Sequence, residues 1–142
     1  MIAYFDTSAL LRLVIAEDGA AQAMLLWQQA GEVVVSRLAW PEAAAALAAA
    51  RRGRRVSDEG HQTATDGLRS CLERCTMVSI ADSLVDRAAD LAAGHDLRAA
   101  DAIHLATALA VMEADSVLVT WDKRLRLAAI QAGLVTAPAG PA

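Results

Sequence analysis

Lysine is almost absent from this sequence, and positive charge is in deficit. Twelve arginines are joined by Lys123 alone, and 17 acidic residues leave a formal net charge of −4. A protein that coats nucleic acid usually carries an excess of basic residues, so the bulk charge disfavours that class. Charged residues make up only 21% of the chain and aliphatic residues are many, which excludes intrinsic disorder.

Long hydrophobic runs are missing as well. The most apolar stretch, residues 43–50, is eight residues long and lies between Glu42 and Arg51, whereas a membrane-spanning helix needs about 20 apolar residues. Asp6 interrupts the first apolar run and no basic segment precedes it, which is unlike a signal peptide. The sequence therefore predicts a cytoplasmic protein with no membrane partner.

Cysteine is scarce too. Cys71 and Cys75 are the only two, and their spacing on a predicted helix fits neither a redox pair nor a zinc site. We expect two reduced, partly buried thiols, which is consistent with the cytoplasm.

Alanine is abundant, at 34 of 142 residues, and it is the best helix former. A chain of this length is expected to form one domain around one core. We expect that domain to cover residues 1–136 and the short tail 137–142, which contains proline and glycine, to be disordered.

Short β-rich runs alternate with longer helical segments. This alternation predicts an α/β fold, with a parallel central sheet of four to five strands flanked by helices on both faces. The β-rich runs are residues 2–5, 32–36, 76–80 and 116–120, with a further short run near 134–136. The helical segments are residues 7–16, 19–30, 41–51, 57–74, 83–93, 99–113 and 122–132.

Four carboxylates occupy strand ends or helix starts. Asp6 follows the first strand, Glu42 and Asp101 lie in the first turns of helices, and Asp122 begins the last helix. Ligands of such sheets bind beyond the carboxyl ends of the strands. Converging carboxylates repel one another unless a cation lies between them, and oxygen ligands select Mg²⁺ or Mn²⁺. Such a site can hold a phosphate and activate water.

Each acid also has a structural interpretation. Asp6 and Asp122 can cap the helices that follow them, and Glu42 and Asp101 are favourable charges near helix N-termini. For one acid alone the structural interpretation is preferred. The joint pattern of four favours the metal pocket.

Three segments resemble the PIN-domain ribonucleases, and more narrowly the VapC toxins of bacterial type II toxin–antitoxin modules. They are IAYFDTSAL at residues 2–10, LRAADAIHLATA at 97–108 and LVTWDKRL at 118–125. The resemblance extends over residues 1–134, and the order of the segments makes it specific. It implies a PIN-like three-layer fold with an acidic pocket that holds Mg²⁺, for which Mn²⁺ can substitute.

The resemblance also implies roles for particular residues. Asp6 and Asp101 match metal ligands, Glu42 and Asp122 complete the shell directly or through water, and the hydroxyls of Ser8 and Thr120 support the pocket. The hypothesis is a metal-dependent endoribonuclease in which Glu42 orients or deprotonates the attacking water and Asp122 tunes the shell or holds a second ion. The family further implies an RNA substrate, a homodimer, and a small antitoxin whose tail enters the groove.

Two classes of alternative are weighed against the nuclease: acid-pocket phosphotransfer or signalling proteins, and a non-catalytic binding module. A receiver-type signalling module expects a lysine near the end of a late strand, but Lys123 lies at a helix start. A dehalogenase-like phosphatase wants a second aspartate at the position of Ser8. A non-catalytic module with an acidic metal-binding pocket is disfavoured by the intact set of four acids.

A basic patch surrounds Gly53, and its function is left open. Its guanidinium groups can grip RNA phosphates, bind an acidic segment of an antitoxin, or simply complement the dipole at a helix C-terminus. The patch consists of Arg51, Arg52, Arg54 and Arg55.

Two further residues have a functional and a structural interpretation. His104, three residues after Asp101, could pair with it on a metal, and Trp121 could stack on a base. Packing is favoured for both, because apolar residues flank His104 and tryptophans are usually buried.

Overall fold

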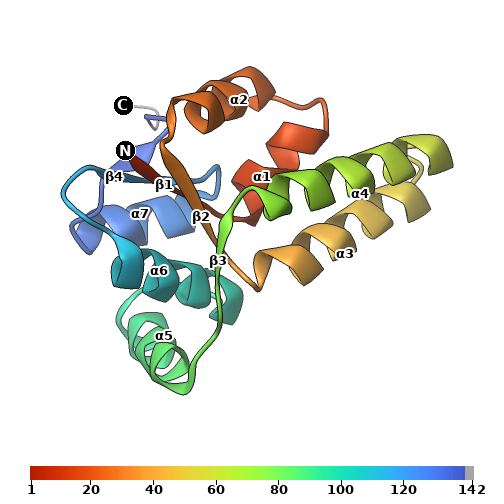
Figure 1. Cartoon of the computed structure of the whole chain (residues 1–142). Coiled ribbons are helices and arrows are strands. Elements are labelled where there is room, and N and C mark those ends of the chain that lie inside the picture. The colour runs from red at the N-terminus through yellow and green to blue at the C-terminus, as the bar shows by residue number, and fades with distance from the viewer. Residues whose placement is uncertain (140–142) are drawn as a thin grey trace.

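A computed structural model of the chain describes residues 1–139 (Figure 1). Within those residues strands and helices alternate, as the sequence predicts. The strands are β1 (Ile2–Phe5), β2 (Glu32–Ser36), β3 (Thr76–Val78), β4 (Ser116–Val119) and β5 (Thr136–Ala137). The helices are α1 (Thr7–Val14), α2 (Ala20–Gln29), α3 (Ala39–Arg52), α4 (Asp58–Glu73), α5 (Asp82–Gly94), α6 (Ala99–Val111) and α7 (Lys123–Gln131).

The strands form one parallel sheet in the order β3-β2-β1-β4-β5. The central strand β1 pairs with β2 on one side and with β4 on the other, so that Ala3 lies opposite Val33 and Val117. The strand order therefore reverses between β1 and β4. In open α/β sheets this reversal leaves a crevice at the carboxyl ends of the strands, where ligands bind.

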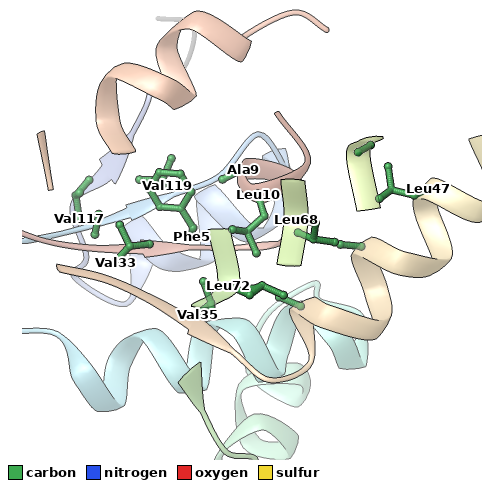
Figure 2. Packing of buried hydrophobic residues seen from close by; sticks show 14 residues of the cluster. Phe5, Ala9, Leu10, Val33, Val35, Leu47, Leu68, Leu72, Val117 and Val119 are labelled. Carbon is green, nitrogen blue, oxygen red and sulfur yellow. The ribbon is translucent and has the colours of Figure 1, made fainter. Parts of the chain in front are cut away.

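Side chains alternate between the two faces of the sheet, and each face has its own core. Phe5 points to the face covered by α1, α3 and α4, where Figure 2 shows it packed among residues that include Leu10 and Leu68. Tyr4 points to the opposite face and packs with Leu105 of α6 and with residues of α7. The result is the expected three-layer arrangement of helices, sheet and helices, and it turns Tyr4 toward α6.

The predicted tail begins in ordered structure. Ala137 was placed in the tail by the sequence prediction, but it belongs to β5 and lies opposite Val119. The prediction is wrong at Ala137 because the outer edge of β4 offers backbone partners: the Thr120 amide donates to the Ala137 carbonyl at 3.0 Å. Residues 140–142 of the predicted tail lie outside the described residues.

The two thiols are placed as the sequence analysis expects. Cys71 and Cys75 are both free and half-buried. Burial raises the pKa of both thiols, and that of Cys75 reaches about 12, so both stay protonated at neutral pH. In the part of the chain that the structure describes, no helix is both long enough and apolar enough to cross a membrane.

Candidate active site

Asp6 is the most firmly held of the four acids. It directly follows β1 and caps α1, and only 3% of it is exposed. Its Oδ1 accepts hydrogen bonds from the Ala9 amide at 2.9 Å and from Ser8 Oγ at 2.7 Å. Its Oδ2 accepts a hydrogen bond from Thr120 Oγ1 at 2.6 Å. Both oxygens of this buried carboxylate are therefore fixed in direction.

The two hydroxyls that hold Asp6 also join the neighbouring strand ends. Ser8 Oγ accepts a hydrogen bond from the Trp121 amide at 2.9 Å, and Thr120 Oγ1 accepts one from the Asp122 amide at 3.0 Å. The Ser8 bond connects the turn after β1 to the turn after β4, across the reversal in strand order, and the Thr120 bond lies within the turn after β4. The supporting role of Ser8 and Thr120 stays a prediction.

The charge of Asp6 is disfavoured as the site stands. Burial raises the pKa of Asp6, and this effect outweighs the charge of His104 and the hydrogen bonds from Thr120, Ser8 and Ala9, which lower the pKa. A buried carboxylate with a raised pKa gains stability from a nearby cation.

Asp101 and Asp122 begin two other helices near this edge of the sheet. Asp101 is half-buried in the first turn of α6, and Asp122 caps α7 by accepting from the Leu125 amide at 2.9 Å. Burial raises the pKa of Asp101 first. The charge of Asp122 raises it further, as do those of Asp6 and Glu42, while His104 offsets part of the effect. The other three acids thus all act electrostatically on Asp101, and we call the four together the acidic edge.

Glu42 is held differently from the other acids. It lies in the first turn of α3, and its Oε1 accepts hydrogen bonds from His104 Nε2 at 2.6 Å and from Thr7 Oγ1 at 2.8 Å. Its side chain is 30% exposed. Burial raises the pKa of Glu42, but the hydrogen bonds from His104 and Thr7 and the charge of His104 prevail, so its pKa is lowered. Glu42 is therefore ionised and fixed on one oxygen.

His104 is a partner of Glu42 and not of Asp101. Its ring is 2% exposed and lies between Tyr4 and Glu42, with Nδ1 2.7 Å from the Tyr4 hydroxyl. The favoured packing interpretation is right about its burial but incomplete. Sequence reasoning missed Tyr4 and Thr7 in this role. Nothing local in the sequence indicates contacts that join residues about 100 positions apart.

The acidic edge offers a partly hydrated cation the ligands it prefers. Among residues 1–139, the only ion pair that involves the acidic edge joins Glu42 to His104, so Asp6, Asp101 and Asp122 have no basic partner there. Within the same residues no three His, Cys, Asp or Glu side chains lie close enough to enclose a bare ion. Mg²⁺ commonly keeps several waters and uses one or two carboxylates, so it fits this more open oxygen set.

Comparison with known proteins identifies the fold family. The profile of the PIN domain matches residues 3–131. The chain belongs to the PIN-domain family. Within that family it is 38% identical over 138 residues to Ribonuclease VapC45 and to Ribonuclease VapC49 of Mycobacterium tuberculosis, which covers 97% of this chain and 96% of each relative. The resemblance that the sequence motifs carried is thereby confirmed.

Solved structures agree with this PIN-domain fold. VapC20 of Mycobacterium tuberculosis, described as a toxin that cleaves the sarcin-ricin loop, has a TM-score of 0.69 at 18% identity and covers 94% of this chain and 96% of its own. A toxin–antitoxin complex from Klebsiella pneumoniae has a TM-score of 0.61 at 24% identity and covers 86% of this chain and 88% of its own. At these identities the likeness supports the PIN-like fold.

The four arginines of the basic patch are not part of the acidic edge of this PIN domain. All four are exposed at the C-terminal end of α3, and we call them the arginine tip: Arg51, Arg52, Arg54 and Arg55. Glu42 lies at the opposite end of the same helix, about 15 Å away at the usual helical rise. Figure 1 shows α3 and α4 extending together away from the sheet.

Trp121 is a packing residue in this PIN domain, as the sequence analysis favoured. The Arg12 guanidinium lies over its ring, 4.7 Å from the centroid. Gly19 has a φ of +90°, and a Cβ atom there would lie 2.5 Å from Nε1 of the indole. With a guanidinium over the ring and a glycine against its edge, Trp121 supports the turn that follows β4.

Proposed function

We propose that this chain is a divalent-metal-dependent endoribonuclease that acts as the toxin of a toxin–antitoxin pair. The observation that carries the proposal is the acidic edge itself. Asp6 is buried, ionisable and fixed by hydrogen bonds to Ser8, Ala9 and Thr120, and the neighbouring carboxylates raise the pKa of Asp101. The relatives at 38% identity are named ribonucleases, which supports RNA as the substrate.

The roles of the four acids are part of this proposal. VapC-type PIN nucleases depend on a divalent metal ion. We assign Asp6 and Asp101 as ligands of Mg²⁺, for which Mn²⁺ can substitute, with Asp122 and Glu42 completing the shell directly or through water. The ion would supply positive charge to the phosphodiester at this edge. Glu42, ionised and held on Oε1, is placed to orient or deprotonate the attacking water.

Partners and location follow from the same proposal. The Klebsiella pneumoniae relative in fold is a toxin–antitoxin complex, which supports a small antitoxin as partner. We extend the proposal to a homodimer that acts in the cytoplasm, and to contacts between the arginine tip and RNA phosphates.

The signalling alternative is not favoured by the structure. A receiver-type module needs a lysine directed into its acidic pocket. Lys123, the only lysine of the chain, is the exposed first residue of α7.

The test is RNA cleavage by purified protein with and without added Mg²⁺. Asp6→Asn and Asp101→Asn keep the size of the side chain and remove the charge, and each should lower cleavage by at least about 100-fold. Asp90→Asn is the matched control, because Asp90 is an exposed aspartate of α5 outside the acidic edge. Cleavage by Asp6→Asn at the wild-type rate would refute the assignment.

A further inference from the structure

A chain of hydrogen bonds leads from the core of the sheet to the exposed side of Glu42. It starts at the Tyr4 hydroxyl, passes through both ring nitrogens of His104, and ends on Glu42 Oε1. The two heavy-atom distances are 2.7 and 2.6 Å. The rings of Tyr4 and His104 meet edge to face, with centroids 6.0 Å apart. The proposed catalytic roles of Asp6, Asp101 and Asp122 make no use of this chain.

The two contacts fix the orientation of the His104 ring. A carboxylate oxygen accepts hydrogen bonds, so His104 Nε2, 2.6 Å from Glu42 Oε1, is the donor of that contact. Nδ1 of the same ring lies 2.7 Å from the Tyr4 hydroxyl, so the ring cannot turn without losing one of its two partners. Tyr4 therefore fixes the orientation in which His104 holds Glu42.

Only one oxygen of Glu42 is held in this way. Thr7 Oγ1 also donates to Oε1, at 2.8 Å, and it lies 3.2 Å from His104 Nε2. Within residues 1–139 no hydrogen bond engages Oε2 of Glu42. A glutamate has three side-chain torsions, and a water-directing carboxylate must be held closely by its neighbours to act. Fixing Oε1 leaves Oε2 as the free acceptor.

We propose that Tyr4 and His104 are positioning residues, which hold Glu42 by Oε1 so that Oε2 can direct the attacking water. The inference rests on the proposed nuclease function and goes beyond it, because Tyr4 is fully buried in the sheet and cannot touch RNA. Tyr4 acts through His104, and His104 acts through Glu42. Partners that orient a catalytic or metal-binding side chain in this way typically contribute 10- to 100-fold.

The test is a double-mutant cycle on RNA cleavage with Tyr4→Phe and Glu42→Ala. Tyr4→Phe keeps the buried ring and removes one hydroxyl, and we expect kcat to fall about 10-fold with KM changed less than about 2-fold. In the Glu42→Ala background the same change should have no further effect, because the residue through which Tyr4 acts is gone. Equal losses in the two backgrounds would overturn the inference.

Two further measurements separate positioning from stability. His104→Gln retains an N–H donor toward Glu42 and should keep more activity than His104→Leu. Val117→Ala, a core truncation on β4 away from Glu42, should lower the melting temperature without lowering kcat at a temperature where the protein is folded. If His104→Gln and His104→Leu are equally inactive although both are folded, the positioning role is wrong.

A readout without RNA completes the test. Nitrogen-15 NMR of the wild-type protein should show His104 with a proton on Nε2, and Tyr4→Phe should shift the Nδ1 resonance, because Nδ1 loses its partner. A wild-type ring protonated on Nδ1 alone would contradict the proposed contact with Glu42. Failure of the wild-type protein to cleave RNA with Mg²⁺ would refute the nuclease function, whereas cleavage that Tyr4→Phe leaves unchanged would refute only the positioning role.

Discussion

The acidic edge and the arginine tip lie at opposite ends of one helix, α3, and are built in opposite ways. At the first turn, Glu42 is held by His104 and Thr7 among other fixed acids. At the last turn, four arginines are exposed, and none of them forms an ion pair within residues 1–139. Hydrogen bonds at fixed distances determine the position of Glu42 at the first end. At the second end, exposed arginines can act on a charged ligand only through long-range electrostatic attraction, which salt screens. Changes at the acidic edge should therefore alter kcat, and changes at the arginine tip should alter KM.

Among changes that leave all four acids in place, the largest effect is expected from Thr120→Val. Valine has the shape of threonine but leaves Oδ2 of Asp6 without the hydroxyl that now donates at 2.6 Å. An unsatisfied buried acceptor costs about 1–3 kcal/mol, so we expect about a 10- to 100-fold loss in kcat together with a lower melting temperature. RNA-cleavage kinetics and thermal unfolding measure the two effects.

Thr120→Ser is the control for this prediction. Serine restores the hydroxyl to Asp6 and to the Asp122 amide, and should recover most of kcat. If Thr120→Val is as active as the wild type, the acidic edge does not depend on fixed geometry, and the contrast with the arginine tip disappears.

Neutralising the arginine tip should have a smaller effect of a different kind. Replacing Arg51, Arg52, Arg54 and Arg55 with glutamine should raise KM for RNA several-fold at low salt and leave kcat within about 2-fold. Each phosphate contact that is lost should lower the slope of log K against log salt by about 0.7 for single-stranded RNA.

The matched control neutralises two exposed arginines elsewhere, Arg87 of α5 and Arg124 of α7. It should leave the salt slope of RNA binding unchanged. If the four-arginine variant also leaves this salt slope unchanged, the arginine tip is not part of the RNA interface. Its role would then be a contact with an antitoxin or a purely structural one.

Asp101→Asn tests the electrostatic cost of the acidic edge. The folded-state pKa of Asp101 is raised above 3.8, so the folded protein binds this proton more tightly than the unfolded chain. Below about pH 3.8 both states are protonated and the carboxyl contributes nothing. As the pH rises above that value, the folded state loses stability through this group. The metal-free variant should therefore match the wild type at low pH and be more stable at pH 7.

The expected gain is modest, because Asp101 is only half-buried and solvent screens its charge. We expect a melting temperature about 2 °C higher at pH 7 in metal-free buffer. Added Mg²⁺ should stabilise the wild type more than the variant. Thermal unfolding at several pH values measures both effects, and a pH-independent difference would show that Asp101 is not electrostatically strained.

The parts of this molecule that the sequence predicts are those set by local pattern. The alternation of strands and helices predicts the three layers. The acids at strand ends and helix starts predict the acidic edge, because carboxyl ends of parallel strands share one side of a sheet. The supporting role of Ser8 and Thr120 comes instead from the family resemblance, because a hydroxyl two positions from an acid has no specific pattern of its own. The assignment of Ala137 to the tail was wrong for a local reason as well, because an edge strand of two residues has almost no recognisable sequence pattern.

The contacts of Tyr4 and His104 could not be predicted in this way. They depend on which face of β1 meets which turn of α6, and that is decided by the packing of the whole sheet. The sequence pattern places His104 on a buried face but does not say what lies opposite. The backbone of the arginine tip is another feature that the sequence does not reveal. Gly53 has a φ of −81°, and Arg54 is the residue with a left-handed conformation.

Arg54→Gly should give the smallest effect, and unlike most substitutions it should make the folded protein more stable. Arg54 has a φ of +55°, and its amide and that of Arg55 donate to the carbonyls of Arg51 and Ala50, which is the hydrogen-bond pattern of a Schellman cap. Glycine is the residue suited to that position, because a Cβ costs about 1–2 kcal/mol in a left-handed conformation. Part of this gain is offset by the greater freedom of glycine in the unfolded chain. We expect Arg54→Gly to stabilise the protein by about 0.5–1 kcal/mol in urea unfolding.

Arg54→Ala removes the same charge and keeps the strain, so it should show no such gain. A more stable glycine variant that binds RNA less tightly would show that the arginine tip keeps Arg54 for binding at the expense of stability, in contrast to Thr120, whose hydrogen bond to Asp6 both positions that carboxylate and stabilises the fold.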